Sequence, residues 1–474
     1  MKKLTAVLLT AIVVMSALSG CFSATAAKSK TVKSGSWKYT VSKNTAEICK
    51  YTGREKSVTI PEKLGGKRVV SVGKRAFFRN DTITSVRIPK TVRTIGKSAF
   101  EGCKSLGKIT FAIGLRTIGQ DAFYECTSLT SVKLPDTVTE LEKSAFCWCE
   151  KLRTLKLSKN IRVINAHTFN STLITKVTVP ENCVEIGKNA FTLSDVKTVT
   201  IGAKVKRISS GAFDAAKKLK AISVSKDNKY FSANSGILYN KTKTELLAYP
   251  VAKDGTEFTV PAKVETIGGS AFSSSPLRKI TLPVGLKTIG AFAFNSSQKL
   301  VRADIPKTVT TIGKFAFNEC YKLRSVSIPS SVRVIGSSAF ASSGIRTLSV
   351  NHNKSLTLRD GVFSFCNELG KVTLFPVKSS DGNTFESCGS LTEVIIPETV
   401  GKVYKKDFFG CESLKSVTIP ETVTEIGSKA FGITIDAEQE FYKEILIKGF
   451  KMSGKSGSAA EKYAKQNKIP FTAK

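Results

Sequence analysis

Fifteen of the 28 phenylalanines in this chain recur at steps of 22 or 23 residues, interrupted by one step of 59 residues. Self-similarity at a fixed period of about 20 to 50 residues is typical of chains built from stacked repeats. One unit of this size cannot bury its own apolar edge, so neighbouring units stack and share a continuous core. The period therefore predicts an elongated solenoid. These residues, called the ladder phenylalanines below, are Phe77, Phe100, Phe123, Phe146, Phe169, Phe191, Phe213, Phe272, Phe294, Phe317, Phe340, Phe363, Phe385, Phe408 and Phe431.

Each unit has the same internal order, which residues 414–431 show as L-K-S-V-T-I-P-E-T-V-T-E-I-G-S-K-A-F. Val417 and Ile419 alternate with polar residues at the period of a half-buried strand. Pro420 then ends the strand, because proline donates no hydrogen bond to a ladder. In most units glycine, asparagine or aspartate stands four residues before the phenylalanine, as Gly427 does here. These residue types tolerate a positive φ, so we expect a tight corner there, with the aromatic ring inside the coil.

The unit L-x-x-V-x-I-P-x-x-V-x-x-I-G-x-x-A-F-x-x-C resembles the BspA-type leucine-rich repeat, also called the Treponema pallidum type, over about residues 69–432. The resemblance implies a β-rich solenoid: a leucine-rich-repeat superhelix of about 15 coils, with an N-terminal β cap and a short C-terminal helical cap. It also implies a bacterial cell-surface protein, and some members of the family are adhesins. Phe169, Phe363, Phe385 and Phe408 lack the preceding alanine, so we expect slightly irregular coils there.

Residues 1–27 have the pattern of a secretory signal, in which two lysines precede an apolar run too short for a comfortable membrane span. Two cleavage sites are open. The stretch Leu18–Cys21 matches a bacterial lipobox, which would put a lipid on Cys21 and anchor the chain to a membrane. Ordinary cleavage after Ala26 or Ala27 would release a secreted protein instead. Both alternatives predict export, to the cell surface or beyond it.

The rest of the chain divides according to its repeats. The long step between Phe213 and Phe272 holds two strand-like stretches around a turn, which predicts a hairpin. This hairpin either breaks the curvature, the interpretation that we favour, or carries a binding surface. Ser458 and Glu461 form a capping box that should open a short terminal helix. The predicted segments are an N-terminal cap at 28–68, a first repeat block at 69–224, a hairpin insertion at 225–257, a second repeat block at 258–435 and a C-terminal cap at 436–474.

Seven of the eleven cysteines stand three residues after a ladder phenylalanine, where other units have serine, threonine or asparagine. This register predicts small polar side chains that bond to backbone groups inside the turn. Disulfides between adjacent coils are the alternative, because a separation of one coil is within reach of a disulfide. Cys183 falls on a core position instead. The seven are Cys103, Cys126, Cys149, Cys320, Cys366, Cys388 and Cys411.

The residue inventory predicts neither an enzyme nor a cofactor or metal site. The chain has two histidines, His167 and His352, and we expect both at the surface. No CxxC pair, P-loop, zincin motif or glycine-rich dinucleotide fingerprint occurs. Because the repeat spreads serine and threonine evenly, the sequence does not indicate a place where a nucleophile, a base and an orienting group would form a catalytic site.

Positive charge is the second strong signal, since 73 lysines and arginines against 37 acidic residues leave a net charge of +36. The excess is distributed along the repeats, so stacking should turn it into broken basic stripes. Such stripes either form a solvated, aggregation-resistant surface or attract polyanions such as wall teichoic acids, anionic lipid headgroups or sulfated glycans. Nucleic acid is not an expected partner, because the chain is exported and lacks a recognised binding module.

These features predict an exported cell-surface scaffold, monomeric, that binds a protein or glycan ligand and serves adhesion to host or cell-surface macromolecules. The alternative is a wall-associated structural protein held electrostatically by polyanionic polymers. If binding is specific, the outward residues of the strands should carry it. The candidate binding face comprises Arg87, Lys133, Lys156, Ser327, Ser349, Thr373 and Thr418.

Overall fold

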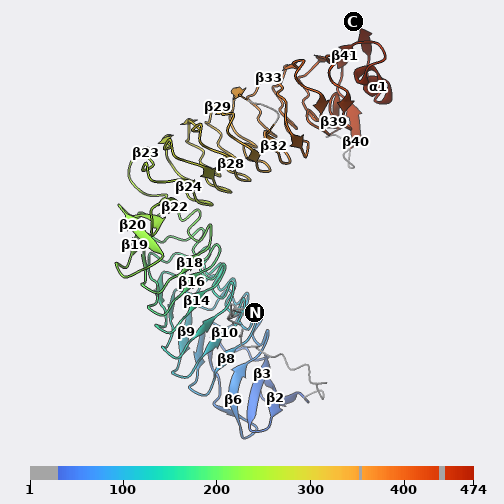
Figure 1. Ribbon diagram of the computed structural model, residues 1–474. Coiled ribbons are helices and arrows are strands. Elements are labelled where there is room, and N and C mark those ends of the chain that lie inside the picture. Colours follow the sequence, from blue (N-terminus) through green and yellow to red (C-terminus); the bar gives the residue numbers. More distant parts are fainter. Residues whose placement is uncertain (1–29, 352–354, 437–442) are drawn as a thin grey trace, which may run out of the picture.

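The computed structural model describes residues 30–351, 355–436 and 443–474. The expected signal segment, with Cys21, and His352 lie outside these residues. The described chain forms a curved β-solenoid of about 18 turns, which confirms the predicted fold class (Figure 1).

The expected number of about 15 coils is too low. That number includes only the turns with a ladder phenylalanine, whereas tyrosine takes that place where each block begins. The Tyr51 ring stacks on Phe77 with ring centroids 5.0 Å apart, and the Tyr249 ring stacks on Phe272 at 5.1 Å. Both tyrosines therefore begin a column of rings that the phenylalanine period alone does not reveal.

Each repeat contributes one strand to the convex side of the arc and a shorter one to the concave side (Figure 1). Neighbouring strands pair in parallel one repeat apart, as Val86 with Ile109 and Thr94 with Thr117. Outward side chains therefore stack in rows along the solenoid axis. The convex strands are β4 (Ser57–Thr59), β7 (Ser85–Ile88), β9 (Lys108–Phe111), β11 (Ser131–Lys133), β13 (Thr154–Lys156), β15 (Lys176–Thr178), β17 (Thr198–Ile201), β19 (Ala221–Val224), β23 (Glu257–Thr259), β25 (Lys279–Thr281), β27 (Arg302–Ala303), β29 (Ser325–Ile328), β31 (Thr347–Val350), β33 (Lys371–Thr373), β35 (Glu393–Ile395) and β37 (Ser416–Thr418). The concave strands are β6 (Lys67–Val72), β8 (Thr94–Ile95), β10 (Thr117–Ile118), β12 (Glu140–Leu141), β14 (Val163–Ile164), β16 (Glu185–Ile186), β18 (Arg207–Ile208), β24 (Thr266–Ile267), β26 (Thr288–Ile289), β28 (Thr311–Ile312), β30 (Val334–Ile335), β32 (Thr357–Leu358), β34 (Ser379–Ser380), β36 (Lys402–Val403) and β38 (Glu425–Ile426).

Both blocks begin with the same arrangement of strands. In the N-terminal segment, β3 pairs antiparallel with β2 and parallel with β6. In the expected insertion, β22 pairs antiparallel with β21 and parallel with β24, and so starts the second concave sheet. The remaining elements are β1 (Val32–Ser34), β2 (Trp37–Ser42), β3 (Thr45–Tyr51), β5 (Lys63–Leu64), β20 (Phe231–Asn234), β21 (Ile237–Asn240), β22 (Glu245–Ala248), β39 (Ile433–Asp436), β40 (Lys443–Leu446), β41 (Lys451–Gly454), α1 (Ala459–Gln466) and β42 (Phe471–Ala473).

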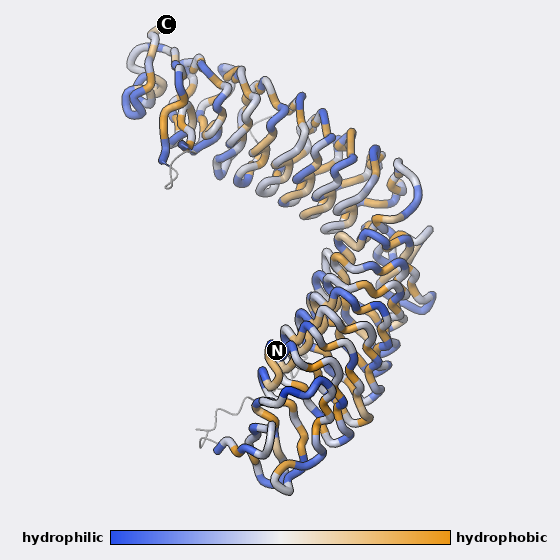
Figure 2. Tube along the Cα trace, turned by 180° about the vertical axis from the view of Figure 1, so that it is seen from behind, coloured by the Kyte–Doolittle hydropathy of each residue, from blue (hydrophilic) through white to orange (hydrophobic). Residues whose placement is uncertain are grey.

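The ladder phenylalanines form two columns of stacked rings inside the coils, which confirms their predicted position. Ring centroids lie 4.7 to 6.0 Å apart from Phe77 to Phe213 and 4.8 to 5.5 Å apart from Phe272 to Phe431. Figure 2 shows the apolar and polar stretches alternating along the trace. The coils that lack alanine before the ring keep this stacking, so the irregularity expected there does not reach the ring column.

The corner residue four positions before the ring does not adopt a positive φ, contrary to expectation. Gly96 and Gly336 do not have a positive φ. Positive φ angles instead occur two positions before each ring and, except at Phe431, two positions after it, as at Ser98 (φ 55°) and Gly102 (φ 71°). Glycine is needed at the corner because neighbouring backbones approach closely. A Cβ on Gly336 would lie 2.3 Å from the backbone nitrogen of Lys314.

Asn165 replaces the corner glycine at one point and separates two coils. In most other coils the corner N–H bonds to the preceding coil, as Gly187 does to the Ile164 carbonyl at 2.8 Å. At Asn165 the side-chain amide takes this place and donates to the Leu141 carbonyl at 2.8 Å. The rings of this coil and the preceding one are 6.0 Å apart, the widest step in either column. The concave sheet ends at β12 and restarts at β14 between the same two coils.

The hydrophobic interior is divided between the two blocks. Leu238, on one face of β21, belongs to the core of the first block, whereas Ile237 and Tyr239, on its other face, belong to the core of the second. This follows from the period of two of a strand, which sends alternate side chains to opposite faces. The strand β21 therefore separates the cores.

A tyrosine hydroxyl from the C-terminal helix α1 bonds to the backbone of Phe431, the last residue of the second ring column. The Tyr463 hydroxyl accepts a hydrogen bond from the Phe431 N–H and donates one to the Phe431 carbonyl, both at 2.9 Å. The predicted capping box does not form: within the described residues the Ser458 hydroxyl has no partner, and the Ser458 N–H donates to the Lys455 carbonyl. Glu461 instead accepts from the Gly457 N–H at 2.6 Å.

The ladder cysteines are buried free thiols, as the register predicted, and form no disulfide in the described chain. Each donates to the carbonyl of the ladder phenylalanine in the preceding coil, for example Cys126 to Phe100 at 3.2 Å. Ser297 makes the same bond to Phe272 at 2.8 Å, which explains why serine and cysteine alternate at this position. Burial raises the pKa of Cys103 to about 12.

Candidate binding surfaces

All seven residues of the predicted binding face are exposed on the convex strands. The structure does not bring them together, because they are divided between the two blocks. Arg87, Lys133 and Lys156 point outward in one row of the first block, where Lys133 and Lys156 are partners on paired strands. The polar members lie in the second block, on β29, β31, β33 and β37, with Ser327 and Ser349 paired directly.

The two blocks differ in how their convex cations are compensated. The first-block convex strands, β4 to β19, carry five exposed cations and no acidic residue. Within the described residues, none of these five side chains forms a salt bridge or hydrogen bond. They are Arg87, Lys108, Lys133, Lys156 and Lys176.

In the second block, each cation on the convex strands has an acidic partner. Lys279 pairs with Glu257 at 3.6 Å, Arg302 with Asp304 at 2.9 Å and Lys371 with Glu393 at 2.8 Å. Such exposed pairs contribute little to stability, but they neutralise the charge that a ligand would meet. Among the convex strands, the uncompensated cations are therefore confined to the first block.

A groove crosses this basic face where the convex strands diverge. Strands β9 and β11 pair only through Lys108 and Ser131, and the sheet breaks again between β13 and β15. The two openings share Asp136, Lys156 and Lys159 and have volumes of about 900 and 690 Å³. We call them together the basic groove. Sequence periodicity could not reveal it, because it depends on where strand pairing stops.

The lining of the basic groove combines cations with apolar surface. Lys133, Arg153, Lys156, Lys159 and Lys176 line it, against Asp136 and Glu181 as its acidic members. Ile113 at its rim is 77% exposed. A linear anion with some apolar character would meet complementary groups along several coils.

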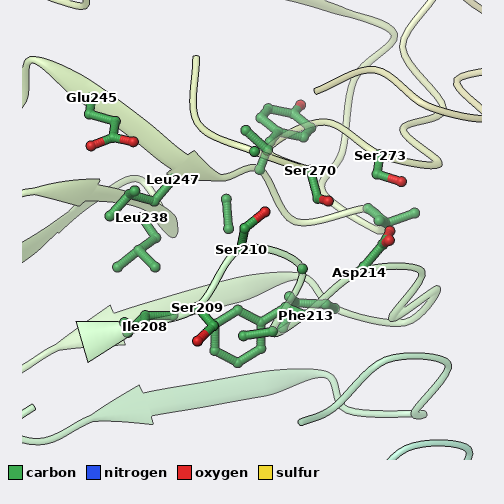
Figure 3. A pocket seen from close by; sticks show the side chains of 18 residues that line it. Ile208, Ser209, Ser210, Phe213, Asp214, Leu238, Glu245, Leu247, Ser270 and Ser273 are labelled. Carbon is green, nitrogen blue, oxygen red and sulfur yellow. The ribbon is translucent and has the colours of Figure 1, made fainter. Parts of the chain in front are cut away.

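A second, smaller cavity of about 140 Å³, with the exposed Ser210 in its lining, lies at the junction of the two blocks (Figure 3). We call it the junction cavity. Its walls come from the last loop of the first block, from β22 and from the loop Gly269–Ser273. In Figure 3, Asp214 and Ser273 lie on one side of the cavity and Glu245 lies on the other. Burial raises the pKa of both carboxyl groups.

His167 is half-buried in a left-handed conformation (φ 59°), so the expectation that it is exposed is wrong. Burial lowers its pKa, and nearby Lys143 and Lys188 add to this shift. In the residues covered by the structure, no three histidine, cysteine or acidic side chains are placed to hold a metal ion. The same residues contain no helix long and apolar enough to cross a bilayer.

Stacked parallel coils, a buried phenylalanine column and cysteine or serine bonds inside each turn together define a leucine-rich-repeat solenoid. The family model for the BspA type leucine rich repeat region (6 copies) matches residues 70–195, 116–245, 251–370 and 378–441. The chain therefore belongs to the BspA-type leucine-rich-repeat family. Proteins of this family are cell-surface proteins and typically scaffolds without enzymatic activity, and the repeat in general indicates protein binding.

Three solved structures of bacterial proteins are similar over most of the chain. A leucine rich cell surface protein from Faecalibacterium prausnitzii is 27% identical, with a TM-score of 0.55, over 84% of this chain and 94% of that one. A leucine-rich repeat protein from Eubacterium ventriosum is 26% identical, with a TM-score of 0.52, over 86% and 96%. The pneumococcal vaccine antigen PcpA shares the fold at 21% identity and a TM-score of 0.53, over 94% and 99%. No curated protein matches the chain.

Proposed function

We propose that this protein is an exported cell-surface binding scaffold that holds a polyanionic macromolecule on the convex face of its first block. The observation that carries the proposal is the set of five uncompensated cations, one on each convex strand from β7 to β15, beside the basic groove. Neighbouring strands are about 4.8 Å apart, so these charges follow one another along the axis at intervals of one or two coils. A linear polyanion lying along the axis would meet them in succession.

The likeness to bacterial surface proteins supports the location, and a surface scaffold of this kind fits adhesion to host or cell-surface macromolecules. A sulfated glycan or an acidic protein segment supplies the required charge. Lipid attachment at Cys21 would keep the scaffold on the cell, whereas ordinary cleavage would release it. Membrane partitioning of a Cys21→Ser variant separates these two forms of export.

The experiment compares two triple variants that remove the same charge. Lys133→Gln/Lys156→Gln/Lys176→Gln removes three uncompensated cations from the first block. The control, Lys279→Gln/Arg302→Gln/Lys371→Gln, removes three ion-paired cations from corresponding convex strands of the second block. Affinity for a sulfated glycan is measured across a salt series, with a neutral glycan as the blank.

We expect the first-block variant to lose about tenfold or more in affinity, since three exposed charge contacts of up to about 1 kcal/mol each are removed. The control should stay within about twofold of the wild type. Equal losses in both variants would reject the first-block site. They would favour the second candidate, a wall-associated structural protein held by the net charge of +36 as a whole.

A further inference from the structure

The ladder phenylalanines follow a backbone rule that Phe213 breaks. Thirteen of the fifteen donate their N–H to a carbonyl of the next coil, as Phe100 does to Ala122 at 2.8 Å. Phe431, at the end of the second block, donates to the Tyr463 hydroxyl. Among the residues that the structure describes, none accepts from the Phe213 N–H. Phe213 lines the junction cavity.

The end of the second block shows that a hydroxyl group can bond to the backbone of the last ladder residue. There the Tyr463 hydroxyl both accepts from and donates to the last ladder residue. At the end of the first block, no described side chain bonds to the Phe213 backbone in this way. An unpaired buried N–H costs about 1 to 3 kcal/mol, so an acceptor at this place would be stabilising.

Asp214, in the same cavity, has an oxygen atom that lacks a hydrogen-bond donor among the described residues. Its Oδ1 atom is shielded from solvent and has no hydrogen-bond partner in the described chain. A hydroxyl group can donate to this oxygen, and another hydroxyl can accept from the Phe213 N–H. The remaining wall offers serine hydroxyls, including Ser210 and Ser270, together with the apolar side chains of Leu238 and Leu247.

We propose that the junction cavity binds a small neutral polyhydroxylated molecule that bridges the two blocks. Its hydroxyl groups satisfy the Phe213 N–H and Asp214 Oδ1, and its carbon skeleton lies against Leu238 and Leu247. The volume of about 140 Å³ limits its size. Cavities of about 150 Å³ accommodate benzene, a molecule of six heavy atoms, so a three- or four-carbon polyol is the size that fits. Because both blocks line the cavity, the bound molecule stabilises their contact.

The test soaks crystals of the full exported chain with glycerol or erythritol and measures binding in solution by saturation-transfer NMR. We expect polyol density in contact with the Phe213 nitrogen and Asp214 Oδ1. Mannitol, which is too large, and benzene, which lacks hydroxyls, should give no signal from the cavity. Asp214→Asn should weaken polyol binding about tenfold, because a hydrogen bond to a charged acceptor is lost.

Polyols also stabilise proteins generally through exclusion from their surface, so thermal shifts need a matched control. Ala248 lines the cavity, and Ala248→Leu should fill it. The wild type should show an additional, saturable rise in melting temperature that Ala248→Leu lacks. Water alone in the soaked wild-type cavity, or equal shifts in both proteins, would overturn the proposal. The soaked wild-type crystal decides the matter even if a variant folds poorly.

Discussion

Removal of one ladder ring should destabilise the second block strongly. Phe317 is fully buried, and its ring lies 4.9 Å from that of Phe294 and 5.1 Å from that of Phe340. Phenylalanine-to-alanine changes in cores cost about 3 to 5 kcal/mol, and the cost rises when the site cannot collapse. Here the Phe317 N–H is bonded to the Ala339 carbonyl at 2.6 Å. Because such bonds fix the spacing between coils, the coils cannot move together to fill the cavity left by the ring. We therefore expect Phe317→Ala to cost about 5 kcal/mol, near the upper end.

Phe365, which stands two residues after the ladder residue Phe363, provides a matched control. It is 50% exposed and has a positive φ of 57°, so Phe365→Ala should change stability by less than about 1 kcal/mol. Urea unfolding followed by circular dichroism measures both variants. Hydrogen exchange of the surrounding coils should accompany it, because solenoids can unfold in parts. Similar costs for the two variants would refute the interpretation of the ring column as the main source of stability.

Three further predictions concern a corner glycine, the cysteines and a buried aspartate. Gly336→Ala should destabilise by about 1 to 3 kcal/mol, measured by thermal unfolding, because its Cβ would meet the neighbouring coil, and a neutral result would contradict the close approach. Thiol titration at neutral pH should detect Cys49, which is half-buried, and only denaturant should expose all ten described cysteines as thiols; fewer would indicate disulfides. Burial raises the pKa of Asp407, so its contribution to stability is present below the unfolded pKa and is lost as the pH rises through the folded value. Raising the pH from about 4 to 7 should therefore lower the unfolding free energy of the wild type more than that of Asp407→Asn, and parallel profiles would argue against this role.

The corner position shows how far residue types can be interpreted. Both a positive φ and a close approach of two backbones select glycine, so Gly96 or Gly336 in the sequence is compatible with either cause. The backbone angles and the neighbouring coil decide for close approach. By residue type alone, Asn165 is another corner residue that tolerates a positive φ. Its side chain in fact replaces a backbone bond and widens the step between two coils.

For the candidate binding face, the sequence predicts which side chains point outward, but only the structure shows which charges are compensated. Strand alternation placed Lys133, Lys156 and Thr418 outward correctly, because a period of two depends only on local geometry. Whether a lysine on a strand is compensated depends on the neighbouring strand, which lies one repeat away. The partner of Lys371 is Glu393, whereas Lys133 stands beside Lys156.

The amino-acid sequence by itself determined the solenoid, the position of the ring column and the register of the ladder cysteines. These features repeat in every coil, so a local pattern is copied many times and needs no long-range information. The tertiary structure alone decided where the repetition fails: the widened step at Asn165, the basic groove and the unpaired Phe213 at the junction cavity. Each failure arises from contacts between chain segments about one repeat or more apart, and their distances and bonds exist only once the coils have stacked.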